Sequence, residues 1–359
     1  MKKYKRITIK IGSNVLTRSD GTLDITRMSA LVDQIAELRQ RRIEIIIVSS
    51  GAVASGRSEL HVSSRMGKVE ERQLFSAVGQ AKLINRYYEL FREYSIPVGQ
   101  VLTMKENFST RVAYLNQRNC MEVMLMNRVI PIVNENDTTS ITELMFTDND
   151  ELSGLVATMI QSDALFILSN VDGIFTGQPE DVSSLLIREV KPGEDLSKYI
   201  QTETSGFGRG GMSTKSSVAG KVAAEGIEVV IANGTTKSVL LHVIEDSGFP
   251  CTRFLPSVGK MTSVKKWVAH SGGFAKGTVY LNDDAIKVLA GSKAVSLLPV
   301  GITKIEGNFE KDDIIRLADK TGKEIGVGKA AYDSRKAAGV VGKHYERPLV
   351  HYDYLFLEI

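Results

Sequence analysis

Short apolar runs alternate with longer segments of helical periodicity along the first 250 residues of the chain. The runs at Ile7–Ile11, Ile43–Val48 and Ala164–Leu168 have the length of strands, and the β-branched character of Ile43–Val48 suits a strand buried on both faces of a parallel sheet. Between the first two runs, residues 24–40 carry Ile, Met, Leu and Val at helical spacing. The same alternation predicts strands at 98–102, 129–133 and 228–231, and helices at 70–94, 112–126, 151–161 and 213–225.

This repeated strand and helix alternation predicts an α/β fold, with an open, mainly parallel sheet sandwiched by helices. Ligands of such sheets bind beyond the carboxyl ends of the strands. The residues that directly follow each predicted strand are therefore the first candidates for chemistry.

The pattern changes after Pro256, where the segments become short and are punctuated by glycine. This predicts a small, mostly β second domain. We therefore expect a first domain at 1–256 and a linker with a second domain at 257–359, whose core spans about 275–354. Its expected segments are 277–281, a small helix at 283–290, 294–298, 314–318 and 324–327.

Composition narrows the class of protein. The chain has 359 residues, a formal net charge of +3 and 43% hydrophobic residues, as in a globular enzyme and unlike a disordered chain. The apolar runs are far shorter than the roughly 20 residues of a membrane helix, and the N-terminus lacks the core of a signal peptide. The two cysteines and five histidines have no spacing typical of a disulfide framework or a zinc site. We expect a reducing, cytoplasmic setting.

Two predicted strands end in residues that suit an anion. Lys10 and Gly12 close the first strand, and Ser50 and Gly51 follow the second. Glycine lets backbone amides approach a phosphate, lysine neutralises its charge, and small residues at a helix start leave amides free. Each exit alone is explained by an ordinary turn. Two of them on neighbouring strands favour the binding of a phosphate or a carboxylate.

Two acidic and amide-rich segments follow. Asn134–Asp137 comes directly after a buried strand, and Asp148, Asn149 and Asp150 open a helix. A single aspartate at that helix start would be an N-cap, and Asx residues also build turns. Two aspartates flanking an asparagine exceed what capping needs. They suit an ammonium group, a Mg²⁺ ion, or the orientation of catalytic lysines.

A glycine-rich segment lies at 205–215. It satisfies G-x-G-x-x-G formally, but a polar stretch rather than a strand precedes it, so the dinucleotide fingerprint lacks its context. Met212 stands where a Walker A loop would carry lysine, and the protein kinase signatures are missing. What remains is a glycine loop, expected to be exposed, that leads into Ser213, Thr214 and Lys215. This arrangement predicts a cradle for polyphosphate.

These motifs, in this order and at these intervals, resemble the amino acid kinase family over nearly the whole chain. The tail resembles a PUA domain through 277–281, 296–302 and 307–309. The order of the two domains is that of bacterial members that phosphorylate the side-chain carboxylate of L-glutamate with ATP. Such enzymes yield L-glutamyl 5-phosphate in the first step of proline biosynthesis. One departure is Ser169-Asn170, where the family often has Thr-Asp.

The resemblance implies a role for each motif. Lys10 and Lys215 would act on the transferred phosphoryl group, Asp150 would orient them, and Asp137 would face the α-ammonium group of glutamate. The implied substrate-binding residues are Ser50, Gly51, Asn134, Asp137, Asp148 and Asn149. The implied ATP-binding residues are Lys10, Gly12, Ser169, Asn170, Arg209, Gly210, Gly211, Met212, Ser213, Thr214 and Lys215. Mg²⁺ would bridge the β- and γ-phosphates, with no protein ligand assigned to it.

Two alternatives remain open on the sequence. One is another member of the same family, such as an aspartate, acetylglutamate or uridylate kinase. The other is an RNA-binding or RNA-modifying protein, since PUA domains occur in many of them. Residues 257–359 carry a net charge of +4 with 12 interspersed acids, which is weak support for a nucleic-acid partner.

The resemblance also implies partners. They are proline as a feedback inhibitor, the downstream glutamyl phosphate reductase, and further copies of the chain in a dimer or tetramer. We expect no membrane partner, and nucleic acid is not expected either.

Overall fold

The computed structural model describes most of the chain, which divides into two compact units. The described residues are 4–60, 66–139, 146, 148–178, 181, 183–199, 211–245, 248–257, 267–268, 272–291, 295–344 and 347–357. One unit comprises 1–105 with 117–260, and the other comprises 106–116 with 261–359. The second unit thus includes the short segment 106–116, which interrupts the sequence of the first unit. Nothing in the sequence pattern indicates this exchange.

The first unit is built on an eight-stranded sheet. In the order β3-β4-β2-β1-β5-β7-β8-β6, all neighbours run parallel except β7 and β8. This confirms the open, mainly parallel sheet expected from the sequence. Its strands are β1 (Arg6–Ile11), β2 (Glu44–Ser49), β3 (Val98–Thr103), β4 (Ile130–Glu135), β5 (Ala164–Ser169), β6 (Glu189–Val190), β7 (Glu228–Asn233) and β8 (Cys251–Phe254).

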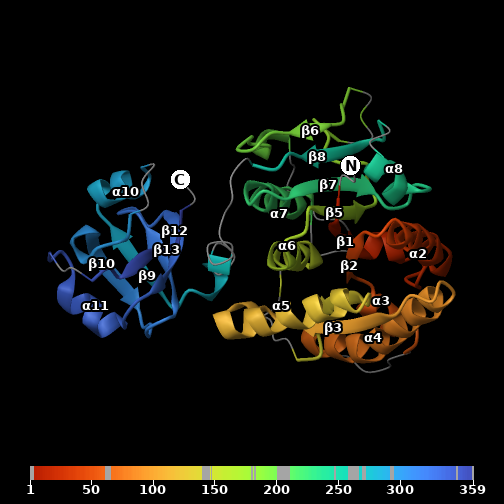
Figure 1. Cartoon of the computed structure of the whole chain (residues 1–359), viewed down its shortest axis with the longest axis horizontal. Coiled ribbons are helices and arrows are strands. Elements are labelled where there is room, and N and C mark those ends of the chain that lie inside the picture. The colour runs from red at the N-terminus through yellow and green to blue at the C-terminus, as the bar shows by residue number, and fades with distance from the viewer. Residues whose placement is uncertain are drawn as a thin grey trace. The chain divides into compact units, whose positions relative to one another are not determined.

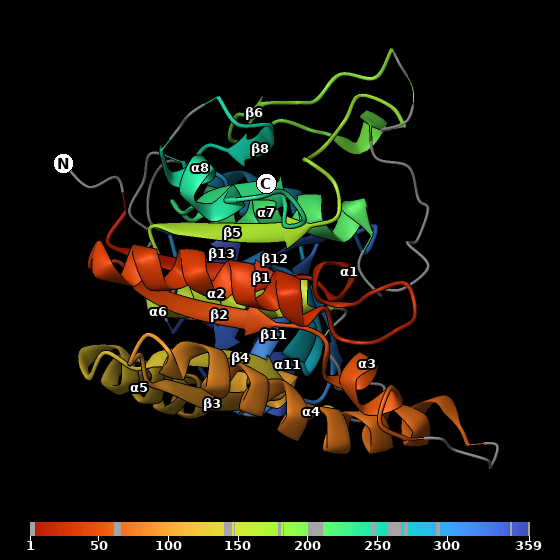
Figure 2. The ribbon, with the colours of Figure 1, turned by 90° about the vertical axis from the view of Figure 1, so that its right-hand side faces the viewer.

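Helices cover both faces of this sheet (Figures 1 and 2). The core on one face joins the central strands to α2, α4 and α8, and the core on the other joins them to α6 and α7. No helix in the described ranges is long and apolar enough to cross a membrane. The helices are α1 (Ser13–Leu16), α2 (Ile25–Gln40), α3 (Ala52–Arg57), α4 (Lys68–Arg92), α5 (Arg111–Met126), α6 (Asn149–Ile160), α7 (Met212–Ala224) and α8 (Val239–Glu245).

The predicted elements of this unit are all present, with ends that differ by a few residues. The sequence pattern did not predict α8 or β8, because seven and four residues are too few to establish a period. The other strands could be predicted because burial on both faces makes them continuous apolar runs. Every residue of β4 and β5, for example, is buried.

Two glycines let α3 and α4 cross closely below the site. A Cβ atom on Gly79 would lie 1.8 Å from the carbonyl oxygen of Ala52, and one on Gly56 would lie 1.8 Å from that of Phe75. Only residues without a side chain permit this approach. The crossing holds the start of α3, directly after Gly51, against a long and well-packed helix.

The second unit contains a five-stranded sheet in the order β10-β9-β11-β12-β13, in which only β9 and β11 run parallel. This confirms a mostly β tail. Within the predicted segment 294–298, however, the described residues form no strand, and Leu297 makes a single bridge to Val350. The elements are β9 (Gly277–Leu281), α10 (Asp283–Leu289), β10 (Ile302–Gly307), β11 (Ile314–Ala318), β12 (Glu324–Ala330), α11 (Ser334–Val340) and β13 (Val350–Leu357).

The segment 106–116 joins the second unit through an aromatic cluster. The indole N–H of Trp267 donates to the carbonyl oxygen of Phe108 at 2.9 Å. The guanidinium of Arg111 lies 5.8 Å from the Trp267 ring and 5.4 Å from that of Tyr114. These cation–π contacts explain why a segment so far away in the sequence belongs to this unit.

Candidate active site

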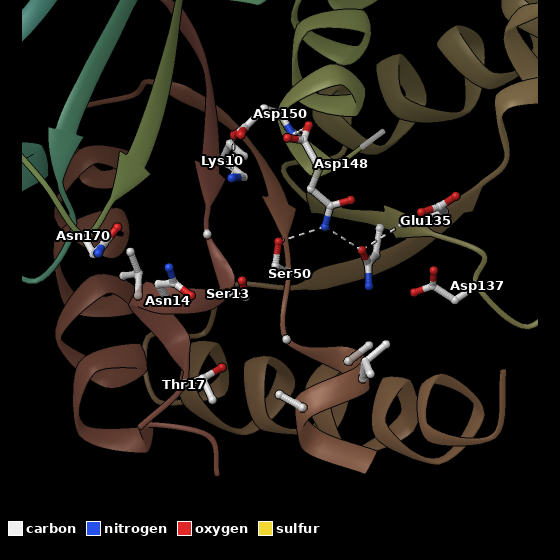
Figure 3. Close-up of a pocket in the computed structure, with 18 of the residues that line it drawn as sticks. Lys10, Ser13, Asn14, Thr17, Ser50, Glu135, Asp137, Asp148, Asp150 and Asn170 are labelled. Carbon is white, nitrogen blue, oxygen red and sulfur yellow. Dashed lines mark hydrogen bonds and ion pairs between the residues drawn. The ribbon is translucent and has the colours of Figure 1, made fainter. Parts of the chain in front are cut away.

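A pocket of about 860 Å³ opens at the carboxyl ends of β1, β2, β4 and β5. This is the edge where open parallel sheets bind their ligands. Figure 3 shows Asn14 and Asn170 at one side of the pocket, Glu135 and Asp137 at the other, and Ser50 between them. The pocket is therefore elongated, with chemically different ends.

Two lysines and one aspartate form a buried group of charges in the pocket. We call Lys10, Asp150 and Lys215 the lysine centre. The Nζ atom of Lys10 lies 2.5 Å from Oδ1 of Asp150, and that of Lys215 lies 3.1 Å from Oδ2. Asp150 is 1% exposed. The centre combines two cations with one anion, so it carries a net charge of +1.

The local folds explain this convergence. Lys10 is the last residue but one of β1, whereas Asp150 and Lys215 lie in the first turns of α6 and α7. Burial alone would raise the pKa of Asp150, but the two ammonium groups outweigh burial and lower it. The carboxylate therefore stays ionised and holds both lysines in place. Lys215 is buried in the first turn of α7, and the glycine loop that was expected to be exposed lies before it, largely outside the described residues.

Asp148 is the N-cap of α6. Its Oδ1 atom accepts hydrogen bonds from the backbone N–H groups of Asp150 and Glu151 at 2.9 and 3.0 Å. Burial and the neighbouring Asp150 raise the pKa of Asp148 to about 6. Its second oxygen, Oδ2, is buried without a hydrogen-bond partner in the described part of the chain. Asp148 thus caps the helix that carries Asp150.

A chain of amide groups crosses the middle of the pocket. The side-chain N–H₂ of Asn149 lies within hydrogen-bond distance of the Ser50 hydroxyl, the side-chain oxygen Oδ1 of Asn134 and the backbone oxygen of Ser49, at 2.9, 3.1 and 3.2 Å. Asn134 in turn donates to Oε1 of Gln80 at 2.8 Å. These contacts tie the start of α6 to the exits of β2 and β4 and to α4. Nothing in the sequence pattern marks Gln80, because it lies in the middle of a long helix.

A second charged cluster occupies the end of the pocket beyond β4. We call Arg72, Glu135 and Asp137 the arginine centre. The guanidinium of Arg72 forms ion pairs with both carboxylates, at 2.7 Å for Glu135. Ser76 donates to Asp137 at 3.2 Å. Glu135 accepts the backbone N–H of Phe146 at 3.0 Å.

The two carboxylates of the arginine centre are 3% and 6% exposed. Burial, together with the charge of Asp137, raises the pKa of Glu135 to about 7. Burial also raises the pKa of Asp137, and Arg72 opposes that shift. In the sequence, Glu135 is only one member of a polar run. Nothing local marks Arg72, a helical arginine, as the partner of residues 63 and 65 positions away.

The two predicted glycines behave differently. The N–H of Gly12 donates to the carbonyl oxygen of Leu168 at 3.1 Å, so this amide is already engaged in the sheet. A Cβ atom there would lie 3.1 Å from that oxygen and 3.5 Å from Nζ of Lys10. Gly51 has φ +106°, which favours glycine, and it is the N-cap of α3. Gly12 therefore makes room for Lys10, and Gly51 starts a helix that faces the pocket.

The structure brings most of the predicted site residues into this one pocket. Those that line it are Lys10, Gly12, Ser50, Gly51, Asn134, Asp137, Asp148, Asn149, Asp150, Ser169, Asn170 and Lys215. Gly211 is the N-cap of α7, and Met212, Ser213 and Thr214 form the helix turn that supplies Lys215. Arg209 and Gly210 lie outside the described residues. Lining residues that the sequence analysis did not assign include Ser13, Asn14, Thr17, Arg18, Arg57, Lys68, Glu71, Arg72 and Glu135.

The donor set of the pocket does not form a metal cage. No group of three or more His, Cys, Asp or Glu side chains suited to a metal ion occurs among the described residues. Both oxygens of Asp150 already contact lysines. A divalent cation here would need most of its oxygen ligands from a bound phosphate group or from water.

Comparison with known proteins agrees with this geometry. Residues 5–233 match the amino acid kinase family, and residues 277–352 match the PUA domain. A glutamate 5-kinase of Bacteroides thetaiotaomicron is 62% identical over 99% of this chain and 99% of its own. One of Chlorobaculum tepidum is 47% identical over 99% and 98%. A carbamate kinase of Giardia lamblia bound to AMP-PNP shares the fold at 17% identity, with a TM-score of 0.50 over 72% of this chain and 100% of its own.

Proposed function

Because the chain belongs to the amino acid kinase family, we propose that this pocket transfers the γ-phosphoryl group of ATP to the side-chain carboxylate of L-glutamate. The product is L-glutamyl 5-phosphate, and the reaction is the first step of proline biosynthesis. The observation that carries the proposal is a pair of charged centres in one pocket, a positive one suited to phosphate and an acidic one suited to an ammonium group. The extensive identity to two glutamate 5-kinases supports the same substrate.

The chemistry needs no general base. A side-chain carboxyl with an ordinary pKa of about 4.3 is ionised at pH 7 and is already a nucleophile. The obstacle is electrostatic, because this anion must approach a phosphoryl group that is itself negative. Phosphoryl transfer is catalysed mainly by positioning and by neutralisation of charge.

The lysine centre meets that requirement. Its net charge of +1 is held in place before the reaction by Asp150, so little reorganisation is needed when charge develops on the phosphoryl oxygens. Opposite charges about 4 Å apart attract by about 4 kcal/mol at an effective dielectric constant near 20. Lys10 and Lys215 are therefore the catalytic residues of the proposal, and Asp150 positions them.

The remaining residues divide between two substrates. Ser50, Asn134 and Asn149 offer hydroxyl and amide groups in the middle of the pocket, where the glutamate carboxylate would meet the phosphoryl group. Asp137 would receive the α-ammonium group. Asn170, at the opposite side of the pocket, would lie against ATP (Figure 3). Ser169 and the turn from Gly211 to Thr214 complete the proposed ATP-binding residues, together with Arg209 and Gly210.

Mg²⁺ fits this scheme as part of the substrate. The pocket lacks a dedicated cage in its described residues, so we propose that the ion arrives on the β- and γ-phosphates of ATP. It would supply further positive charge to the phosphoryl oxygens. The residues of the chain then have only to bind and orient the complex.

The partners belong to the same proposal. A pocket that binds the α-amino end of glutamate offers a site at which proline, the end product, could compete. We also propose that the chain forms a homo-oligomer in the cytoplasm. It would deliver the acyl phosphate to glutamyl phosphate reductase.

The test is an ATP-dependent hydroxamate assay with L-glutamate, L-aspartate and N-acetyl-L-glutamate side by side. We expect turnover with glutamate and little with the other two. Preference for aspartate or N-acetylglutamate would assign the chain to a different substrate within the family. Lack of turnover with any of the three, in a folded protein supplied with MgATP, would contradict the proposal.

A further inference from the structure

The arginine centre contains two carboxylates but only one guanidinium. With all three groups ionised its net charge is −1, in a place where both carboxylates are almost fully buried. Within the part of the chain that the structure describes, Arg72 is the cation paired with these carboxylates, and a buried negative charge without a counter-ion is costly. The centre can be neutralised in two ways: one carboxylate takes up a proton, or a second cation enters the pocket.

We infer that Arg72, Glu135 and Asp137 bind the α-ammonium group of the substrate together, with Arg72 positioning the two carboxylates and Glu135 releasing a proton as the ammonium group binds. This inference rests on the proposed function, since it assigns the ammonium group of glutamate to this end of the pocket. It adds two residues and a proton to that assignment.

The geometry makes Arg72 a positioning residue. It lies on α4, and one of its terminal nitrogens contacts the carboxylate of Glu135, at the end of β4, and that of Asp137, two residues later. Ser76, one helical turn after Arg72, donates to the other oxygen of Asp137. Helix α4 thus holds Asp137 from two positions, and the loss of Arg72 would leave both carboxylates without the cation that they share.

The proton balance follows from the charges. Without a ligand, a protonated Glu135, an ionised Asp137 and Arg72 sum to zero. When an ammonium group enters, Glu135–COOH becomes Glu135–COO⁻, the proton goes to the solvent buffer, and two anions then face two cations. The pKa of Glu135, raised to about 7 by burial and by Asp137, means that about half of the free protein holds this proton at neutral pH.

Other charged groups line the same pocket and could influence a pH profile. Among the described residues they are Arg18 between α1 and α2, Arg57 on α3, Lys68 and Glu71 on α4, Asp148 before α6, and the lysine centre. Asp148 has a pKa raised to about 6, so its titration falls below that of Glu135. A substitution at Glu135 alone therefore separates the two.

The experiment is the pH dependence of KM and kcat for L-glutamate at saturating MgATP, from pH 6 to 8. For the unaltered protein we expect 1/KM to rise about tenfold over this range, with a midpoint near 7, since binding requires the loss of one proton. For Glu135→Gln we expect a KM that is raised at pH 8 and nearly independent of pH. Titration of ATP itself is common to both proteins and cancels in the comparison.

Substitutions of Arg72 should change KM and its pH dependence in a way that differs from Glu135→Gln. Arg72→Gln should raise KM at least tenfold while kcat changes much less, and the midpoint should move to higher pH, because the guanidinium lowers the pKa of Glu135. Arg72→Lys, which keeps a positive charge at this position, should reverse part of the shift in the midpoint. The matched control is Arg86→Gln, which removes an arginine from the same helix whose partner is the exposed Glu89. It should leave the profile unchanged.

A second measurement needs no variant. Adding L-glutamate to the unaltered protein in weakly buffered indicator dye at pH 7 should release about half a proton for each ligand bound. Turnover of glutamate with no proton release, or with a midpoint near 7 retained in Glu135→Gln, would overturn the inference and leave the proposed function standing. Failure to phosphorylate glutamate at all would instead contradict the proposed function.

Discussion

The lysine centre and the arginine centre are opposite versions of one design within a single pocket. The first places one carboxylate between two cations, and the second places one cation between two carboxylates. With every one of these groups ionised, each centre is one counter-charge short of neutrality. The proposed substrates supply both missing charges, the phosphoryl group at one end and the ammonium group at the other. The comparison explains how a pocket can orient a zwitterionic amino acid toward ATP.

The two centres also show that burial raises the pKa of a carboxyl group unless enough positive charge lies beside it. Asp150 and Glu135 are 1% and 3% exposed, so burial pushes the pKa of both upward. Two ammonium groups reverse that push at Asp150. At Glu135 the shared guanidinium does not reverse it, because Asp137 adds a second negative charge. One carboxylate is held ionised, whereas the other is left close to its titration point.

The largest expected effect comes from breaking the lysine centre. Lys215→Ala should lower kcat by about a thousandfold, because one pre-positioned cation at the transferred phosphoryl group is lost. Lys221→Ala removes an exposed lysine from the same helix and should leave kcat unchanged. Circular dichroism checks that both variants fold. Near-normal turnover in folded Lys215→Ala would show that the positive centre does not act on the reacting group.

The next largest effect comes from removing the charge that the arginine centre is expected to bind. N-acetyl-L-glutamate should have a kcat/KM at least about a hundredfold below that of L-glutamate, since an unpaired buried charge costs several kcal/mol. Glutarate lacks the amino group but is no larger than glutamate, so its rate shows the effect of the missing charge without the effect of the bulky acetyl group. If glutarate reacts as fast as glutamate, the ammonium group contributes nothing and the opposite-sign comparison fails.

A smaller effect concerns stability. A carboxyl group whose pKa is raised by folding binds more protons folded than unfolded, so its contribution to stability falls as pH rises from about 4.5 to about 7. Glu135→Gln removes this loss, and the variant should gain up to about 3 kcal/mol relative to the parent between pH 4.5 and pH 8. Urea unfolding at both pH values measures it, with exposed Glu89→Gln as the control. An unchanged difference would mean that Glu135 titrates normally.

All three residues of the lysine centre could be predicted from the sequence, whereas only the acidic side of the arginine centre, in the segment Asn134–Asp137, could be. Lys10 and Asp150 sit at a strand end and a helix start, and parallel topology brings such positions together whatever lies between them. The glycines before Lys215 mark a helix start in the same way. Local pattern was therefore enough for this half of the pocket.

Arg72 and Gln80 face the site from within α4. At such a position, the sequence pattern predicts that an arginine or a glutamine belongs to the solvent-exposed face of the helix. Their partners at Glu135 and Asn134 lie more than 50 positions away. Only the packing of α4 on the sheet decides which turn of the helix meets the exit of β4. The engaged amide of Gly12 was hidden for the same reason, since its acceptor, Leu168, belongs to a distant strand.

The smallest effect on activity should come from removing the tail. Every residue of both centres precedes residue 216, and all six lie in the first unit. A protein ending near Ser257 should therefore keep both charged centres, because a domain with its own core can fold alone. Its kcat and its KM for glutamate should stay within several-fold of the parent.

Its thermal unfolding midpoint should fall, because the truncation removes Trp267, whose indole N–H holds Phe108. The hydroxamate assay and circular dichroism measure the two properties separately. A folded but inactive truncation would show that the opposed centres alone do not make the active site and that the tail takes part in building it.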